Sequence, residues 1–292
     1  VPLYKFTGST LRLTPAGPSL AALPKKMRRA VFSDYLEVDM SSAQLALAAS
    51  LWGDLPKLRS LLQSDERGWW GELIRWLTEK LPAPRFCREE HFGRVKGVLK
   101  GFTYGLFFGM STRNLHQLGN PRSDSTDADS YYDSIRFLNK LFLPKRYLPW
   151  YRRHPRKSVR KIGDTLFAHP CIRKLLSRRD EMLSQIKEDG YITGCFGRRI
   201  ETGGERGPKS VLAEFMQNAE LKVMLPVGEA VLSSEKLRFG LGQHDGVTIA
   251  PRRRKPWAYG QAVDKAREAL QKGRKELQEA MDVPPIETEL TV

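Results

Sequence analysis

The chain has 292 residues, 40% of them hydrophobic and 10% aromatic, so it can bury a sizeable core in one large domain or two lobes. Lys and Arg outnumber Asp and Glu by 49 to 33, which gives a formal charge of +16. Such an excess favours a polyanionic partner, nucleic acid first and an anionic membrane second, with a generally basic surface as the alternative.

The cysteines and the apolar runs argue against two other classes of protein. Cys87, Cys171 and Cys195 are far apart and form no Cys-x-x-Cys pair, which argues against a disulfide framework or a zinc site. Their number fits the cytoplasm or another reducing intracellular compartment, and a viral or mobile-element source is compatible with it. No apolar run reaches the ~18 residues of a membrane-spanning helix, and we expect no membrane partner.

The N-terminal part of the chain leads to a first candidate site residue. Residues 1–30 are expected to be loops, because glycines and prolines interrupt any long element. Residues 35–39 have the pattern of a short strand, and residues 41–49 that of a helix with a serine near its N-cap. Asp39, at the end of this strand, is well placed for a metal ligand, although the local pattern equally fits an ordinary aspartate near a helix start.

Residues 51–82 are expected to be helical, with aromatic and leucine side chains on one face. Trp69, Leu73, Trp76 and Leu77 share that face, which is more typical of a packed core than of a cofactor site.

A second helical pattern carries a row of cations and aromatic rings. Lys96, Lys100, Tyr104 and Phe108 are spaced by four and fall along one helical face. The lysines suit phosphate charge, and a ring can stack under a base, so this face suits a nucleoside triphosphate. A core helix with a solvated basic end is the alternative.

The middle of the chain is rich in basic residues. A polar, turn-rich loop is expected at 118–127 and a helical pattern at 132–143. Residues 145–161 then carry eight Lys or Arg in 17 positions, interleaved with tyrosine and tryptophan. This combination suits a phosphate backbone and an unstacked base, with a solvated basic loop as the alternative.

The remaining patterns alternate between helices and hairpins. A helix is expected at 171–189, a hairpin at 190–200, a helix at about 210–225, a hairpin at 239–250 and an amphipathic helix at 263–281. His244 and Asp245 lie at the turn of the second hairpin.

Taken in order, these segments resemble the family A DNA polymerases, typified by bacterial DNA polymerase I. Residues 39–45 resemble the family's first motif, an Asp followed by a small polar run and a helix. Lys96, Lys100, Tyr104 and Phe108 match its fingers helix, and His244-Asp245 its His-Asp hairpin turn. Three further blocks follow the family's order: Arg12 to Pro24, Gly190 to Arg199, and the helix with Lys209 and Gln217. Together the match covers roughly residues 7–250.

The resemblance implies a metal site and a nucleotide site. Asp39, Asp245 and the backbone carbonyl of Met40 would hold two Mg²⁺ ions, for which Mn²⁺ can substitute. Lys96 and Lys100 would bind the triphosphate, and Lys100 would give a proton to the leaving pyrophosphate. The remaining implied nucleotide contacts are Tyr104 against the incoming base and sugar, Phe108 beside the templating position, and Gln44 near the ribose.

The resemblance also implies a DNA-binding surface. Arg12 and Gln217 would contact the minor-groove side of the primer-end pair, His244 would support the primer terminus, and Lys209 would contact DNA. We expect the basic insertion at about 144–170 to grip template or displaced strand through its densest cations, Arg152, Arg153, Arg156 and Lys157.

Some positions depart from the family pattern. Gln44 stands where a glutamate is usual, which leaves the discrimination between deoxyribose and ribose open. Tyr104 stands where a phenylalanine is usual, and this implies easier acceptance of dideoxynucleotides. Phe108 replaces the usual tyrosine, Gly246 the acidic residue after the second aspartate, and Ala213 an asparagine.

The expected fold is α/β (α+β): a right-hand polymerase palm with an antiparallel sheet, and a helical fingers subdomain. The palm would comprise residues 1–65 and 205–292 and the fingers 66–204, with the thumb and exonuclease domain absent from this chain. The expected partners are primer-template DNA, dNTPs, and a separate thumb, processivity or replication subunit. A non-catalytic nucleic-acid-binding module of a replication complex and a single-subunit RNA polymerase-like enzyme are the alternatives.

Overall fold

The computed structural model describes residues 4–7, 12–15, 25–53, 55–63, 68–81, 92–93, 95–97, 99–100, 103, 163–204, 206–242, 246–253, 255–288 and 290–292. Its contacts divide the chain into two compact units, residues 1–59 with 182–292, and residues 60–181. Each unit is described by itself. The borders of palm and fingers expected from the resemblance stay a prediction.

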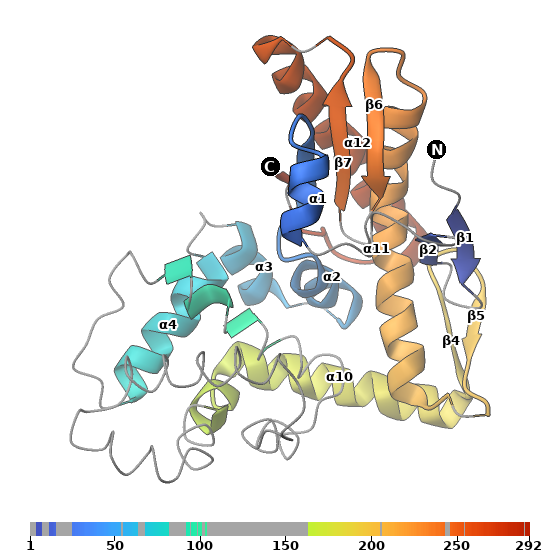
Figure 1. The fold of residues 1–292 in the computed structure, drawn as a ribbon. Helices are drawn as coiled ribbons and strands as arrows, with labels where there is room; N and C mark the ends of the chain where they lie inside the picture. The colour runs from blue at the N-terminus through green and yellow to red at the C-terminus, as the bar shows by residue number, and fades with distance from the viewer. Residues whose placement is uncertain are drawn as a thin grey trace, which may run out of the picture. The chain divides into compact units, whose positions relative to one another are not determined.

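The first unit is built on a four-stranded antiparallel sheet (Figure 1). Its strand order is β6-β7-β3-β8, with β3 at Leu36–Met40, β6 at Leu237–Gly242, β7 at Gly246–Pro251 and β8 at Leu290–Thr291. The strand expected at 35–39 and the hairpin expected at 239–250 are confirmed, whereas β8 was not expected. Strands β3 and β7 pair from Leu36↔Ile249 to Asp39↔Gly246, so the sheet joins the two segments that carry the family-like aspartate motifs.

Strand β3 has one buried face and one half-buried face. Val38 is fully buried and Met40 is 4% exposed, whereas Glu37 and Asp39 are half-buried. Successive side chains of a strand point to opposite faces of the sheet. The apolar residues therefore hold β3 to the core, and the same alternation turns both carboxylates to the other face.

Two long helices pack on this sheet and on each other. They are α11 at Pro208–Leu232 and α12 at Pro256–Met281, and Figure 1 shows α12 behind β6 and β7. At their crossing, a Cβ added to Gly273 would lie 2.1 Å from the backbone oxygen of Val223. Only a glycine allows so close an approach of the two backbones.

The end of α11 corrects the expectation from the sequence. The pattern predicted a helix from about 210 to 225, because a proline usually stops or kinks a helix. The helix instead continues through Pro226 to Leu232. Val223, Val227 and Val231 are all buried, so a continuous apolar face holds the helix together beyond the proline.

The N-terminal residues also correct the expectation. Where loops were expected over residues 1–30, β1 at Tyr4–Thr7 pairs with β2 at Arg12–Pro15, and α1 spans Lys25–Val31. The strands are four residues long, too short for a recognisable alternation of apolar and polar residues.

A second hairpin packs against α11. Strands β4 at Tyr191–Thr193 and β5 at Arg199–Glu201 are antiparallel, which confirms the hairpin expected at 190–200. Between them, the Cys195 thiol donates a hydrogen bond to the backbone oxygen of Asn218 on α11 (3.2 Å). Burial raises the pKa of Cys195 to about 12, against the opposing effect of the Lys222 charge.

The second unit is helical where it is described. It contains α4 at Gly68–Lys80; α3 (Pro56–Gln63) and α10 (Pro170–Asp189) each cross the border between the units. Trp69, Leu73 and Leu77 are buried, which confirms a core face on α4. His169 is 1% exposed and meets the edges of Trp69 and Trp76, with ring centroids 5.6 and 5.1 Å away.

The protein therefore combines helices with an antiparallel sheet, as the sequence predicted for its fold class. Within the described ranges, no helix is both long and apolar enough to cross a membrane.

Candidate active site

Asp39 lies near the end of β3 and lines a hollow. Two residues separate the strand from helix α2 at Ala43–Leu51. Ser42 at the N-cap is in the left-handed region (φ 50°), and its side chain makes no capping hydrogen bond. The serine expected near the N-cap is therefore confirmed. The left-handed residue costs about 1 kcal/mol and turns the chain sharply just after the aspartate.

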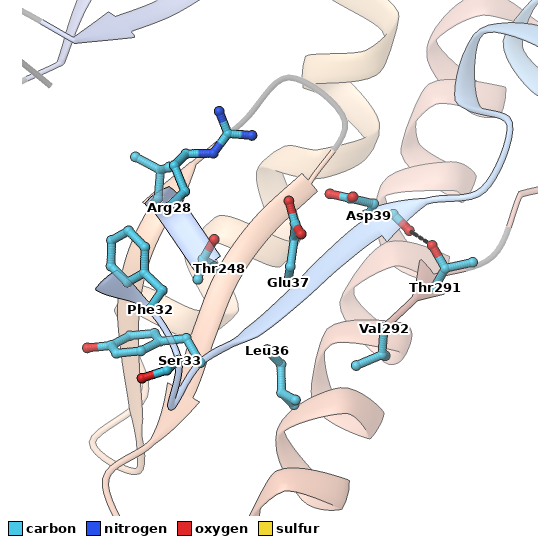
Figure 2. A pocket seen from close by; sticks show the side chains of 11 residues that line it. Arg28, Phe32, Ser33, Leu36, Glu37, Asp39, Thr248, Thr291 and Val292 are labelled. Atoms are coloured by element: carbon cyan, nitrogen blue, oxygen red, sulfur yellow. Dashed lines mark hydrogen bonds between the residues drawn. The ribbon is translucent and has the colours of Figure 1, made fainter. Parts of the chain in front are cut away.

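The backbone around Asp39 is fixed on both sides by sheet pairing. Asp39 pairs with Gly246 of β7 and with Thr291 of β8. The Thr291 hydroxyl also donates a hydrogen bond to the Asp39 backbone oxygen (3.2 Å), drawn as a dashed line in Figure 2. The side chain of Asp39 is therefore mounted on a rigid part of the sheet, as a positioned functional group requires.

The hollow beside Asp39 has a volume of about 530 Å³. We call it the Asp39 hollow; it is lined by Arg28, Phe32, Ser33, Tyr35, Leu36, Glu37, Asp39, Leu241, Thr248, Thr291 and Val292. Figure 2 shows Glu37 and Asp39 projecting from the same face of β3 and Arg28 reaching from α1. Two carboxylates and one guanidinium thus surround a space of the size of a small-molecule site.

The aromatic wall of the Asp39 hollow is held against β6. Phe32 and Tyr35 pack edge to face, with ring centroids 5.2 Å apart. A Cβ added to Gly240 would lie 2.9 Å from the Tyr35 ring, so the rings rest directly on the β6 backbone. The register of β6 with β7 shifts between Phe239 and Leu241, next to this glycine, as expected for a bulge.

Gly246 lies directly beside the Asp39 carboxylate. A Cβ added to Gly246 would lie 1.8 Å from Asp39 Oδ1 and 2.9 Å from the backbone oxygen of Val38. The position at which the resemblance leads us to expect an acidic residue therefore has no room for a side chain while Asp39 keeps its present position. The glycine lets the Asp39 carboxylate lie over the neighbouring strand.

Other candidate residues of the first unit lie on several elements. Met40 is buried in β3, and Gln44 is half-buried in the first turn of α2, outside the lining of the Asp39 hollow. The Gln44 Oε1 atom is buried and accepts no hydrogen bond from any residue that the structure describes. On α11, Lys209 is exposed and Gln217 half-buried, and Arg12 starts β2.

The lysines of the fingers-like motif belong to the second unit. Every described residue between 92 and 103 is helical, in agreement with the sequence pattern. Val95 and Leu99 are fully buried, Lys96 is half-buried and Lys100 exposed. A core stripe thus runs beside the lysines, so the helix has both the buried face of a core helix and the cations that a triphosphate requires.

The other candidates fall outside the described residues. These are Tyr104, Phe108, Arg152, Arg153, Arg156, Lys157, His244 and Asp245. Among the described residues, no group of three or more His, Cys, Asp or Glu is arranged to hold a metal ion.

The sequence pattern did not reveal Glu37 and Arg28 as neighbours of Asp39. The sequence could have revealed Glu37, because residues two apart on a strand point to the same face of the sheet and Glu37 lies two residues before Asp39. Arg28 comes from α1, in a segment expected to be loop, and its position beside β3 depends on tertiary packing. Asp39 and Glu37 supply the hard oxygen donors that Mg²⁺ prefers, so the residues present fit a divalent cation.

Comparison with solved structures finds chains with a similar fold. The POL domain of Pol1 from M. smegmatis, solved in complex with DNA primer-template and dNTP, resembles this fold with a TM-score of 0.59. The likeness covers 99% of this chain and 46% of that chain, at 16% sequence identity. This chain thus spans less than half of the length of the protein it matches, and the likeness concerns the fold. No protein-family model matches the chain, and no curated protein does.

Proposed function

We propose that this chain is a template-directed DNA polymerase of the family A type, which joins dNTPs to the 3′ end of a primer. The observation that carries the proposal is the pairing of Asp39 with Gly246. Gly246 follows Asp245 directly in the chain, so one peptide link separates the second candidate carboxylate from the residue paired with the first. The likeness of the fold to a POL domain supports the same function.

In this proposal, Asp39 and Asp245 hold two Mg²⁺ ions with help from the Met40 carbonyl. When bound, such ions stabilise the charge on the attacking and leaving oxygens of phosphoryl transfer. The sheet fixes the backbone of Asp39, and the absence of a side chain at Gly246 leaves its carboxylate in place. The protein's contribution would thus be to fix the backbone of Asp39 beside Gly246, the residue that follows Asp245 in the chain.

The nucleotide and the DNA would be bound by the remaining motif residues. Lys96 and Lys100 would hold the triphosphate, and Lys100 would supply a proton to the pyrophosphate. Tyr104 would stack on the incoming base, and Phe108 would lie near the templating base. Gln44, with its buried amide oxygen, would lie near the sugar and decide how strictly a ribose is rejected.

The DNA itself would be held by groups from both ends of the chain. Arg12 and Gln217 would check the shape of the primer-end pair, His244 would support the primer terminus, and Lys209 would contact the backbone. The basic insertion would add phosphate contacts through its densest run of cations. Palm at 1–65 and 205–292 and fingers at 66–204 remain our assignment, as does a separate thumb or processivity subunit.

The experiment that tests this function is primer extension with Mg²⁺, with dNTPs and rNTPs in separate reactions. We expect extension with dNTPs, and a loss of about 10³-fold or more for Asp39→Asn and for Asp245→Asn, because each removes a charged metal ligand. Asp264→Asn is the matched control: Asp264 is 68% exposed on α12, paired at the surface with Arg267.

The other outcomes decide between the alternatives. Extension by both aspartate variants at the control rate would contradict the proposed site. Tight binding to primed DNA without extension would favour a non-catalytic module. Extension with rNTPs at a similar rate would favour an RNA polymerase-like enzyme in which Gln44 is no barrier.

A further inference from the structure

A second hollow lies at the other end of the β6–β7 hairpin. It has a volume of about 790 Å³ and is formed where α11 leads into β6 and β7 leads into α12, at the top of the view in Figure 1. We call it the basic hollow. Its lining residues are Ser233, Ser234, Glu235, Lys236, Leu237, Pro251, Arg252, Arg253, Trp257, Ala258, Gln261, Ala262 and Lys265.

The basic hollow is separate from the Asp39 hollow. The two hollows share no lining residue. β7 runs from Gly246, which pairs with Asp39, to Pro251, which lines the basic hollow. Five steps of about 3.3 Å along a strand separate these residues by roughly 17 Å. A ligand in the basic hollow would therefore not occupy the reaction site.

Four cations and one carboxylate give the basic hollow its charge. The cations are Lys236, Arg252, Arg253 and Lys265, and the acid is Glu235. In the part of the chain that the structure describes, none of these four cations forms an ion pair.

Two of the cations are held opposite each other by the sheet. The backbone N–H of Arg252 donates a hydrogen bond to the Lys236 oxygen (2.8 Å), so like charges are kept at the same end of the hairpin. The first turn of α12, which borders the hollow, carries no acidic residue. With four cations against one carboxylate in its lining, the basic hollow favours an anion from outside.

An exposed aromatic ring stands among the cations. Trp257, in the first turn of α12, is 55% exposed, whereas Trp52, Trp69 and Trp70 are at most 3% exposed. Aromatic residues with this exposure beside cations provide a surface on which a base can stack while its phosphates are neutralised. The size of the hollow is in the range of small-ligand sites.

We propose that the basic hollow binds single-stranded nucleic acid, with phosphates at its four cations and a base stacked on Trp257. The choice of nucleic acid over an acidic peptide rests on the proposed function, on the formal charge of +16, and on the exposed ring, which an acidic peptide does not require. Such a site would hold a strand on the palm at a distance from the reacting end.

The test compares two triple variants that remove the same number of charges. Binding of 16-nucleotide oligo-dT and oligo-rU is followed by fluorescence anisotropy over a range of salt concentrations. The variant of the hollow is Lys236→Gln with Arg252→Gln and Arg253→Gln. The control is Arg267→Gln with Lys272→Gln and Lys275→Gln, all more than half exposed on α12 outside the hollow.

We expect the negative slope of log K against log salt to become shallower by about 2 in the variant of the hollow, since three phosphate contacts of ~0.7 each are lost. The control should keep the slope. Trp257→Ala should weaken binding roughly 5- to 150-fold, and Trp257→Phe should recover part of the loss. Crosslinking with a 5-iodouracil-substituted strand should label the peptide 255–265, which contains Trp257. Binding of either strand supports the proposal, and the tighter one indicates whether DNA or RNA is the natural ligand.

Equal slopes for the two triple variants, or crosslinks that leave residues 255–265 unlabelled, would overturn the proposal. Displacement of the strand by a poly-glutamate peptide, together with no effect of Trp257→Ala, would show an acidic-peptide site instead. The binding assay is repeated with Asp39→Ala, which cannot extend a primer under the proposed function. If the original chain binds the strand at the hollow but synthesises no DNA, the proposed function is wrong and the nucleic-acid site stands. If it synthesises DNA but binds no strand at the hollow, the proposed function stands and the nucleic-acid site is wrong.

Discussion

Placing a side chain at Gly246 should displace the Asp39 carboxylate and stop nucleotide addition. In Gly246→Ala, the new Cβ would lie 1.8 Å from Asp39 Oδ1 and 2.9 Å from the Val38 backbone oxygen. The Val38 oxygen cannot retreat without disturbing β3, which pairs with β7 along this stretch. The Asp39 side chain can rotate, so the collision is relieved mainly by moving the carboxylate.

The expected magnitude has two parts. Overpacking at a tight site costs about 1–3 kcal/mol of folding stability. A reacting group misplaced by about 1 Å loses about 10²-fold in rate, so we expect primer extension to fall 100-fold or more. Gly246→Glu, which places an acidic residue where the resemblance implies one, should be at least as slow, because the longer side chain meets the same obstruction at its Cβ.

The assay is single-turnover primer extension beside thermal unfolding, with Gly260→Ala as control. A Cβ at Gly260, on α12, would meet no atom within 4 Å apart from its chain neighbours and the backbone of its own helix, so the control should extend normally. Extension by Gly246→Ala or Gly246→Glu at the original rate would refute the reasoning that this glycine makes room for the Asp39 carboxylate.

Further predictions concern the stability and chemistry of the first unit. Gly273→Ala should lower the free energy of unfolding by about 1–3 kcal/mol, because its Cβ meets a backbone oxygen of α11 at 2.1 Å. Gly260→Ala on the same helix should raise the free energy of unfolding by about 0.5–1 kcal/mol. Equal denaturation midpoints for the two variants would contradict this prediction. Arg206→Ala should lower the free energy of unfolding by about 2–4 kcal/mol, because it removes the ion-pair partner of Glu214, which is 2% exposed; an unchanged urea midpoint would contradict this. Cys195 should react with iodoacetamide at pH 8 about 1,000-fold more slowly than an ordinary thiol, because its pKa is raised to about 12 from 9.0. Rapid labelling of the folded chain would contradict the burial. The Cys195 thiol loses its proton at a lower pH in the unfolded chain than in the folded chain, so its contribution to the free energy of unfolding is full below pH 9.0 and declines as the pH rises toward about 12.

The sheet of the first unit was predictable where local patterns were strong. The apolar-polar alternation before Asp39 predicted β3 without knowledge of its pairing. The turn pattern around His244 predicted the β6–β7 hairpin, although the first half of that segment is too rich in glycine for strict alternation. That the segments of Asp39 and Asp245 belong to one antiparallel sheet was expected only from the resemblance, and the pairing of Asp39 with Gly246 was not predicted. Pairing between strands some 200 residues apart leaves no local signal in either strand.

The features that the sequence did not predict depend on tertiary packing. Pro226 stops a helix in isolation, but the buried valines around it keep α11 continuous. Strand β8 is two residues long and exists through its pairing with β3. Gly246 and Gly273 are required because a neighbouring strand or helix comes too close for a side chain. The sequence shows that both residues are glycines, but it does not show which part of the chain lies against them.

The sequence and the structure single out different residues of the candidate site. Asp39 lines a hollow that suits a ligand, whereas Glu37 and Arg28, which also line it, were not predicted. Glu37 lies there because it alternates with Val38 on β3, and Arg28 because α1 packs beside the strand. Lys96 and Lys100 lie on a helix as the pattern predicted. Their relation to the bound triphosphate stays a prediction.

The most direct test of the central claim is a double-variant measurement on Asp39 and Asp245. Single-turnover primer extension is measured for Asp39→Asn, for Asp245→Asn and for the chain with both changes. If both carboxylates serve one pair of metal ions, the double variant should be about as slow as the slower single variant, because groups that act as a unit lose their effect together. Losses that multiply would show two independent contributions and would contradict a shared metal site.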